Sequence, residues 1–147
     1  MLTIRDLQAG DIEPLAELHR QFWNESADMH DTQKMREVFD RLRDNDAYIL
    51  LCAVEGDRLA GSVMGIVCDE LFGDCRPFLL VENMVVDRAQ RRKGVGKALF
   101  AQLEARAKAK GCRQIILVTE SDREDACGFY PSIGFHPTAN KGFKKKL

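Results

Sequence analysis

The chain has 147 residues, of which 45% are hydrophobic and 31% are charged, and its net charge at pH 7 is -1. This length and balance predict one globular domain spanning residues 1–147. The near-zero charge gives no reason to expect nucleic acid or an anionic membrane as partner, and no apolar run approaches the roughly 18 residues that a membrane span needs.

Hydrophobic spacing divides the first half of the chain into a strand, two helices and a hairpin. Apolar residues recur every three or four positions up to about residue 45, and continuous strand-like runs follow. Asp11 is placed to cap the first helix. The expected elements are a strand Leu2–Arg5, helices Asp11–Trp23 and Thr32–Asn45, and strands Ala47–Val54 and Leu59–Val67 joined by a turn at Gly56-Asp57.

The second half alternates strands with helices. The order of all elements predicts an α+β fold, an α/β sandwich whose mixed, mostly antiparallel sheet of six or seven strands is flanked by four helices. The expected elements after an exposed loop at 69–76 are strands Phe78–Val86 and Gln114–Thr119, helices Gly94–Lys110 and Glu124–Ser132, and a last edge strand Phe143–Leu147.

Signals for export and for metal binding are missing from the sequence. The N-terminus acquires charge at once and lacks the apolar core of a secretion signal, so we expect a cytoplasmic protein. The five cysteines and three histidines do not fall at zinc-ligand spacing, so we expect reduced thiols and no metal.

A basic, glycine-containing turn lies between the strand that ends at Val86 and the helix that follows. Glycines let the main chain approach a ligand closely, and the unpaired N–H groups of a helix start form an anion site. A pyrophosphate is the natural occupant. The turn and first helical residues are Arg91, Arg92, Lys93, Gly94, Val95, Gly96, Lys97 and Ala98.

Two nucleotide motifs are excluded by particular residues of this turn. A Walker A loop needs glycine where Arg91 stands and serine or threonine where Ala98 stands. A dinucleotide fingerprint needs glycine at the position of Leu99. Coenzyme A remains as the source of the pyrophosphate.

Two motifs resemble those of the GNAT superfamily of acyl-CoA N-acyltransferases. Arg91-x-x-Gly94-x-Gly96 matches its Q/R-x-x-G-x-G/A pattern, and the segment 126–135 (ACGFYPSIGF) matches its A-x-x-F-Y-x-x-x-G-F pattern. The resemblance implies a GNAT-like fold and an enzyme that transfers acetyl from acetyl-CoA to a primary amine of a small molecule, by direct attack in a ternary complex. It also implies a homodimer.

The resemblance assigns coenzyme contacts residue by residue. The main chain of Met84, Val85 and Val86 would hold the pantetheine arm and the acetyl carbonyl. The turn from Arg91 to Ala98 would hold the pyrophosphate. Arg123 stands where members of the family often carry an asparagine that contacts pantetheine, so this chain departs from the pattern there.

The chemistry needs a base for the amine and an acid for the departing thiolate. The resemblance assigns Tyr130 as the acid. Glu82 interrupts the apolar strand FLLVENMVV, so we expect a desolvated carboxylate that faces a cavity or a cation. The residue also stands where several small-amine members carry a glutamate. Glu82 is therefore the expected base, with Glu120 or a water chain as alternatives.

No motif names the acceptor. The segments Trp23–His30 and Asp69–Arg76 occupy the places where the family builds its acceptor pocket, and their acids would either attract a cationic amine or be ordinary surface carboxylates. Other functions stay open: acetylation of a protein N-terminus or lysine, and a non-catalytic acetyl-CoA sensor. The acids are Glu25, Asp28, Asp69, Glu70 and Asp74.

Overall fold

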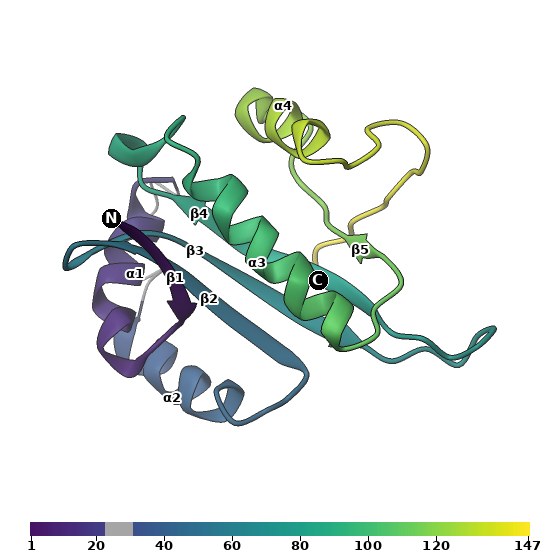
Figure 1. Ribbon diagram of the computed structural model, residues 1–147, viewed down its shortest axis with the longest axis horizontal. Helices are drawn as coiled ribbons and strands as arrows, with labels where there is room; N and C mark the ends of the chain where they lie inside the picture. The colour runs from purple at the N-terminus through teal and green to yellow at the C-terminus, as the bar shows by residue number, and fades with distance from the viewer. Residues whose placement is uncertain (23–30) are drawn as a thin grey trace. The chain divides into compact units, whose positions relative to one another are not determined.

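The computed structural model describes residues 1–22 and 31–147, which form two compact units, residues 1–116 and 117–147. The first unit contains a five-stranded sheet in the order β1-β2-β3-β4-β5 (Figure 1). Strands β1 to β4 form an antiparallel meander, and β5 runs parallel to β4. The strands are β1 Leu2–Asp6, β2 Tyr48–Glu55, β3 Arg58–Cys68, β4 Phe78–Val86 and β5 Ile115–Ile116.

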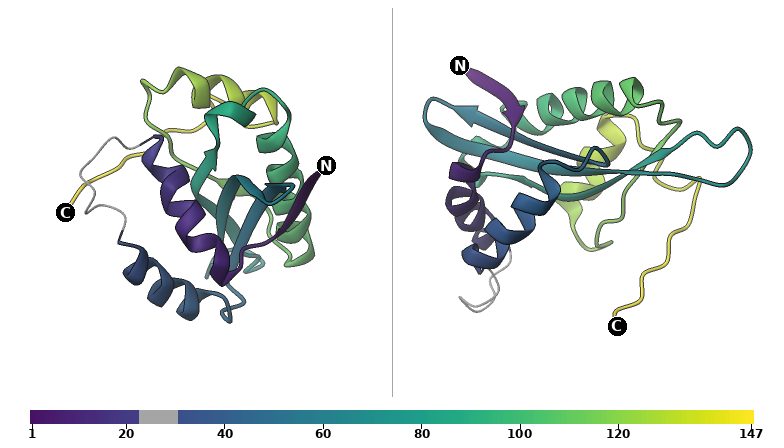
Figure 2. Two further views of the ribbon diagram at one scale, coloured as in Figure 1. Left: turned by 90° about the vertical axis from the view of Figure 1, so that its left-hand side faces the viewer. Right: turned by 90° about the horizontal axis from the view of Figure 1, so that it is seen from below.

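Helices cover both faces of this sheet. Helices α1 and α2 lie on one face and α3 lies on the other, as Figure 2 shows. No helix in the described part of the chain is long and apolar enough to cross a membrane. The helices are α1 Ile12–Arg20, α2 Thr32–Leu42 and α3 Val95–Ala109 in the first unit and α4 Glu124–Ser132 in the second, with short 3-10 turns η1 Ala9–Asp11 and η3 Arg88–Gln90.

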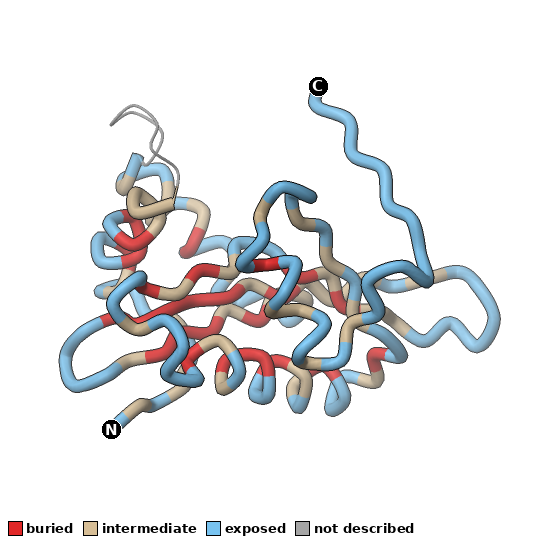
Figure 3. The backbone as a smooth tube through the Cα atoms, turned by 90° about the horizontal axis from the view of Figure 1, so that it is seen from above, coloured by how far each residue is buried: buried red, intermediate tan, exposed pale blue. Residues whose placement is uncertain are grey.

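Helix α3 packs closely on the sheet because two residues of β3 opposite it, Gly61 and Gly65, have no side chain. A Cβ added to Gly61 would lie 2.9 Å from the carbonyl oxygen of Val85 and 3.1 Å from Leu99 Cδ1. Leu99 and Leu103 are completely buried, and each such side chain contributes roughly 1.5–3 kcal/mol by its removal from water. The buried residues concentrate in the central strands and on the inner sides of the helices (Figure 3).

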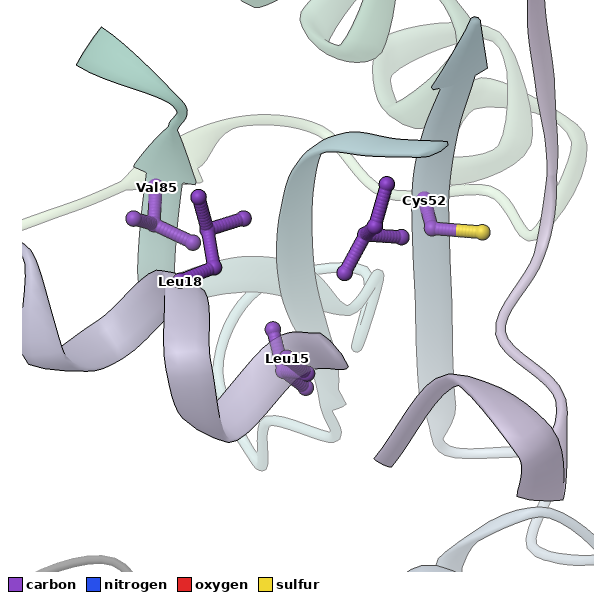
Figure 4. Packing of buried hydrophobic residues seen from close by; sticks show 5 residues of the cluster. Leu15, Leu18, Cys52 and Val85 are labelled. Carbon is purple, nitrogen blue, oxygen red and sulfur yellow. The ribbon is translucent and has the colours of Figure 1, made fainter. Parts of the chain in front are cut away.

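Helix α1 packs on the opposite face, at the end of β4. Leu15 and Leu18 belong to one buried cluster with Cys52 and Val85 (Figure 4). Helix α2 packs chiefly against α1 and η1. The outer helix α2 is therefore supported by α1 rather than by a strand.

The start of α1 corrects one sequence expectation. Asp11 occupies the N-cap position, but its carboxylate accepts no bond from the helix. It accepts instead two bonds from the Arg5 guanidinium, at 2.7 and 2.9 Å, and one from Gln8 N–H at 2.7 Å. Burial raises the pKa of Asp11, yet the bonds from Arg5 and Gln8 outweigh it and hold that pKa below its ordinary value. Burial also raises the pKa of the neighbouring Cys52 thiol, to about 12.

The predicted α+β class is confirmed, and the predicted strand count is wrong. The described residues form five strands rather than six or seven. The segment Phe143–Leu147 forms no strand, because its side chains are all exposed and Lys144 pairs with Glu120 instead of packing on a sheet. Strand β5 covers two residues of the predicted Gln114–Thr119, whereas α4 has the predicted bounds.

Candidate active site

Helix α3 begins without a side-chain cap. Gly94 occupies the N-cap position with φ of 84°, a left-handed conformation that glycine adopts without steric cost. No side chain accepts a bond from the first turn, and that turn contains no acidic residue. The N–H of Ala98 donates to Gly94 O at 2.9 Å. The preceding N–H groups, of Val95, Gly96 and Lys97, are those that a helix start leaves to a bound anion.

Positive charge surrounds this helix start. Arg91, Arg92, Lys93 and Lys97 are all exposed, and Arg92 adopts a left-handed φ of 62°. A helix N-terminus itself carries the equivalent of about half a positive charge. The turn therefore offers both the hydrogen-bond donors and the charge that a diphosphate requires.

The turn predicted to bind the coenzyme, residues 87–98 and here called the coenzyme turn, is fixed to the end of α1 by a buried carboxylate. Asp87, 3% exposed, accepts bonds from Arg58 Nη2 at 2.6 Å, from Ala89 N–H at 3.0 Å and from Gln21 Nε2 at 3.4 Å. Gln21 Oε1 accepts in turn from Arg88 N–H at 3.1 Å. We call these contacts the Asp87 clasp. Since a buried carboxylate is costly without partners, the clasp sets the main-chain path that leads into the turn.

The side chain of Arg91 also lies at the end of α1. Its guanidinium carbon is 4.6 Å from the ring centroid of Phe22, and that of Arg88 is 5.7 Å from the same centroid. Both distances fall within the range of cation–π attraction. Arg91, predicted from the motif as a coenzyme contact, therefore also anchors the turn to the residue that follows Gln21.

Strand β4 is irregular next to the predicted base. Between the pairs Ser62↔Val85 and Met64↔Glu82, β3 advances two residues while β4 advances three. The extra residue produces a β-bulge, and Asn83 within it has a left-handed φ of 53°. The bulge changes the direction of the β4 main chain where the acetyl group was expected.

The outer edge of β4 is only partly paired. Strand β5 pairs with Leu79 and Leu80 alone, so no described strand continues the sheet beside Met84, Val85 and Val86. The main-chain edge of these three predicted coenzyme contacts is therefore unpaired by any strand of the described residues on that side. The Val85 side chain itself is buried under α1.

Glu82 lies on the sheet face that α1 and α2 cover. Val85 belongs to the cluster under α1, and it pairs with Ser62 of β3. Met64 lies two residues after Ser62 and therefore on the same face of the sheet. Glu82 pairs with Met64, so its side chain shares that face. Its side chain is exposed, so the expectation of a desolvated carboxylate is not met. An exposed carboxylate at this place is accessible to an amine or to a water.

The reserve base, Glu120, belongs to the second unit. Its carboxylate bonds to Lys144 Nζ at 3.1 Å. That hydrogen bond, followed by the charge of Lys144, lowers the pKa of Glu120 below its ordinary value. Glu120 is therefore the weaker candidate for accepting a proton.

Tyr130, the predicted acid, lies in α4 of the second unit. Its ring forms edge-to-face contacts with Phe129 and Phe135, with centroids 5.4 and 5.8 Å apart. The main-chain N–H of Phe135 donates to the main-chain carbonyl oxygen of Tyr130 at 3.2 Å, across the turn at Gly134. The predicted coenzyme contacts and Glu82 thus belong to the first unit, and Tyr130 is held by the local packing of the second.

The two predicted acceptor segments differ in what the structure describes. Trp23–His30, with Glu25 and Asp28, lies outside the described residues. The segment 69–76 is the connection between β3 and β4, and Asp69 and Asp74 in it are exposed. Glu70 forms an ion pair with Arg113 at 2.9 Å, so one acid of the expected acidic mouth is neutralised within the protein.

Sequence reasoning missed a cavity and the Asp87 clasp. A cavity of about 780 Å³ lies between α1, α2 and the sheet face that carries Glu82. Helical periodicity marks its lining residues only as core positions, and Gln21 and Asp87 are 66 residues apart, so no local pattern identifies either feature. The apolar lining includes Leu15, Met35, Val38, Phe39, Leu50 and Met64.

Known proteins match this chain in sequence. The model of the Acetyltransferase (GNAT) family matches residues 12–135. The L-methionine sulfoximine/L-methionine sulfone acetyltransferase of Pseudomonas paraeruginosa is 30% identical over 145 residues, covering 90% of this chain and 79% of that protein. A shorter match, 32% identical, covers 52% of this chain but less than half, 44%, of the YdhI protein of Bacillus subtilis.

Solved structures share the fold. A transcriptional regulator from Bacillus halodurans superposes with a TM-score of 0.89 at 23% identity, over the whole of both chains. The aminoglycoside N-acetyltransferase AAC(6′)-Iy, in complex with the bisubstrate analog CoA-S-monomethyl-acetylneamine, superposes with a TM-score of 0.78 at 21% identity, over 100% of this chain and 99% of that chain. At these identities the likeness shows the fold.

Proposed function

The chain belongs to the GNAT acetyltransferase family, as its two motifs predicted, and we propose that it transfers acetyl from acetyl-CoA to a primary amine of a small molecule. The observation that carries the proposal is the start of α3, which has neither a side-chain cap nor an acid in its first turn and is surrounded by cations. A helix start of this kind binds an anion such as the coenzyme pyrophosphate.

In this proposal the coenzyme is held mainly by main-chain groups. The N–H groups of the turn from Arg91 to Ala98 bind the pyrophosphate, and the open edge of Met84–Val86 binds the pantetheine arm. A main-chain N–H next to the bulge donates to the acetyl oxygen as charge develops on it, which is worth about 2.7–4 kcal/mol where such a donor has been removed from an enzyme.

Two side chains move protons. Glu82, on the exposed end of the sheet face, takes a proton from the ammonium directly or through one water, because the amine must be neutral to attack. The amine nitrogen forms a bond to the acetyl carbon, and the bond from that carbon to sulfur breaks. Tyr130 gives its hydroxyl proton to the departing sulfur, so that free coenzyme A leaves as a thiol. The acetylated nitrogen loses its remaining surplus proton to water, and water returns a proton to the Tyr130 phenolate. Such proton transfers typically contribute about 10²–10⁴-fold each.

The cavity favours a small molecule over a protein chain as acceptor. Its volume, about 780 Å³, falls in the range of roughly 300–1,000 Å³ that small-molecule sites occupy. The name of the P. paraeruginosa relative also describes a small acceptor. We further propose that residues 1–147 act as one domain, since the family match runs through both units.

The test is release of free coenzyme from acetyl-CoA across a panel of amines. The panel contains alkylamines, polyamines, aminoglycosides, amino acids and short peptides, with a no-amine control and subtraction of the signal from the five protein thiols. We expect turnover with one class of small amine. Turnover with peptides alone would favour a protein acetyltransferase, and acetyl-CoA binding without any turnover would favour a sensor.

A further inference from the structure

The cavity beside Glu82 has a definite chemical character. Most of its described lining is apolar, and the lining residues come chiefly from α1, α2 and strands β2, β3 and β4. Helix α2 forms its outer wall. The clearest apolar members are Leu15, Met35, Val38, Phe39, Leu50 and Met64.

The charged groups in the described lining balance each other. They comprise one carboxylate, Asp31, and one ammonium, Lys34, and the imidazole of His19 also lines the cavity. The carboxylate already accepts the Lys34 N–H at 3.1 Å as the cap of α2. Ser62, also in the lining, donates its hydroxyl to Leu51 O at 2.9 Å. This lining therefore offers a polycation no excess of negative charge, and removing several ammonium groups from water would be costly.

The cavity is adjacent to the proposed base. Met64 lies in its wall and pairs in register with Glu82, and Asn83, the residue after Glu82, also lines it. A molecule whose body fills the cavity can thus present an amine to the strand that carries the Glu82 carboxylate. An acceptor that fits this arrangement has an apolar body, which contacts the cavity wall, and an amine at the other end, which lies near the proposed base.

We propose that the acceptor is a monoamine with an apolar alkyl or aryl body that occupies this cavity, rather than a polycation. The proposal rests on the acetyltransferase function proposed above and names its substrate class. Apolar burial is worth about 0.8 kcal/mol per methylene, which is roughly a fourfold gain in kcat/KM for each methylene that enters the cavity.

The first experiment uses the unmodified protein. Coenzyme release is measured with straight-chain primary monoamines from ethylamine to octylamine, and with spermidine and neamine as polycations. We expect kcat/KM to rise up to about fourfold per methylene until the cavity is filled, and to exceed the values for both polycations. Values that stay flat with chain length, or a preference for spermidine or neamine, would overturn the proposal.

The second experiment changes the wall. Val38→Glu places a carboxylate in the cavity and should lower kcat/KM for hexylamine about tenfold or more while raising it for spermidine. Gln33→Glu makes the same charge change at an exposed position of α2 that does not line the cavity, and it should leave both values unchanged. Equal effects of the two variants would contradict a role for this wall.

Calorimetry separates this proposal from the proposed function. Hexylamine is titrated into the protein in the presence of coenzyme A, and acetyl-CoA is titrated separately. One outcome is that hexylamine binds, that Val38→Glu weakens this binding, and that no amine is acetylated. This outcome would support an apolar ligand in the cavity and contradict the proposed acetyltransferase function. Turnover of spermidine without binding of hexylamine would support the acetyltransferase function and contradict the apolar acceptor.

Discussion

The coenzyme turn and the acceptor cavity share helix α1 but are made of different groups. The turn meets the end of α1 through Gln21 and Phe22, and in the proposed function it binds the coenzyme through main-chain N–H groups. The cavity meets the middle of α1 through Leu15 and is defined by side chains from distant segments. A main-chain site depends on local conformation, whereas a side-chain cavity depends on how helices and strands pack.

The starts of the four helices also differ in whether they carry an acidic residue. Helix α1 has Glu13 in its first turn, α2 is capped by Asp31, and α4 begins with Glu124 and Asp125. Among these four helices of the described chain, α3 alone has no acid at its start. The acids at the other three starts complement the positive end of the helix dipole, and the start of α3 has no such acid.

The largest expected effect tests the proton donor. Tyr130→Phe should lower kcat by about 10²-fold or more and change the KM for acetyl-CoA by less than about twofold, because the ring packing stays and only the hydroxyl is lost. Steady-state kinetics measures both constants. Tyr48→Phe, at the only other tyrosine, is the matched control. An unchanged kcat in Tyr130→Phe would rule out the acid role.

The next effect separates the two carboxylates. Glu82→Gln should lower kcat roughly 10–100-fold near neutral pH and move the rate optimum to higher pH, where solvent deprotonates the amine. Glu120→Gln should leave the profile in place, because the Lys144 bond lowers the pKa of Glu120 and makes it a weak base. If the pH–rate profile moved in Glu120→Gln and not in Glu82→Gln, Glu120 rather than Glu82 would be the base.

A charge reversal at α3 makes that helix resemble the others. Lys97→Glu puts an acid in the first turn and should raise the KM for acetyl-CoA roughly 10–100-fold, with kcat changed little, because it repels the pyrophosphate. Lys108→Glu, in the last turn of the same helix, is the control and should leave that KM unchanged. Equal KM values in both variants would contradict the proposed anion site.

The Asp87 clasp should have a smaller effect on the same constant. Asp87→Asn keeps an acceptor for the Ala89 N–H but loses the ion pair with Arg58, so the KM for acetyl-CoA should rise about three- to tenfold while the KM for the amine stays constant. Arg58→Gln, which leaves the Gln21 and Ala89 bonds in place, should have a weaker effect. If Asp87→Asn lowered the Tm but left the KM for acetyl-CoA unchanged, the clasp would stabilise the fold without affecting coenzyme binding.

The smallest expected effect lies at the capped helix. Asp31→Ala removes the bond to Lys34 N–H and should cost about 1 kcal/mol of unfolding free energy, with the KM for acetyl-CoA unchanged. Asp31→Asn keeps a capping oxygen and should recover most of that loss. Chemical denaturation measures both, and a changed acetyl-CoA KM would show that the two regions are not separate.

The coenzyme turn could be predicted from the sequence because its determinants are local. Gly94 sets a left-handed N-cap, no acid follows in the first turn, and the basic residues are adjacent. The two motifs then identified the family, and the family model matches 12–135. The predicted bounds of α4, Glu124–Ser132, also match the structure.

Other features could not be predicted because they depend on distant partners. Asp11 has the identity and position of a cap, but Arg5 takes its carboxylate. Glu82 was expected to be desolvated because its strand is apolar, yet the β-bulge and the edge position leave it exposed. The cavity arises because α2 packs on α1 and η1, which hydrophobic periodicity does not encode.

The support of α2 by α1 bears on how such an enzyme can diverge. A wall helix that carries little of the sheet packing accepts new side chains at its exposed and partly exposed positions, away from the buried Phe39, because such substitutions usually change stability by about 0.5 kcal/mol or less. The coenzyme turn, fixed by the clasp to the end of α1, stays intact through such changes. Acceptor preference can therefore evolve, or be engineered, by exchanging a single helix while the acetyl donor remains the same.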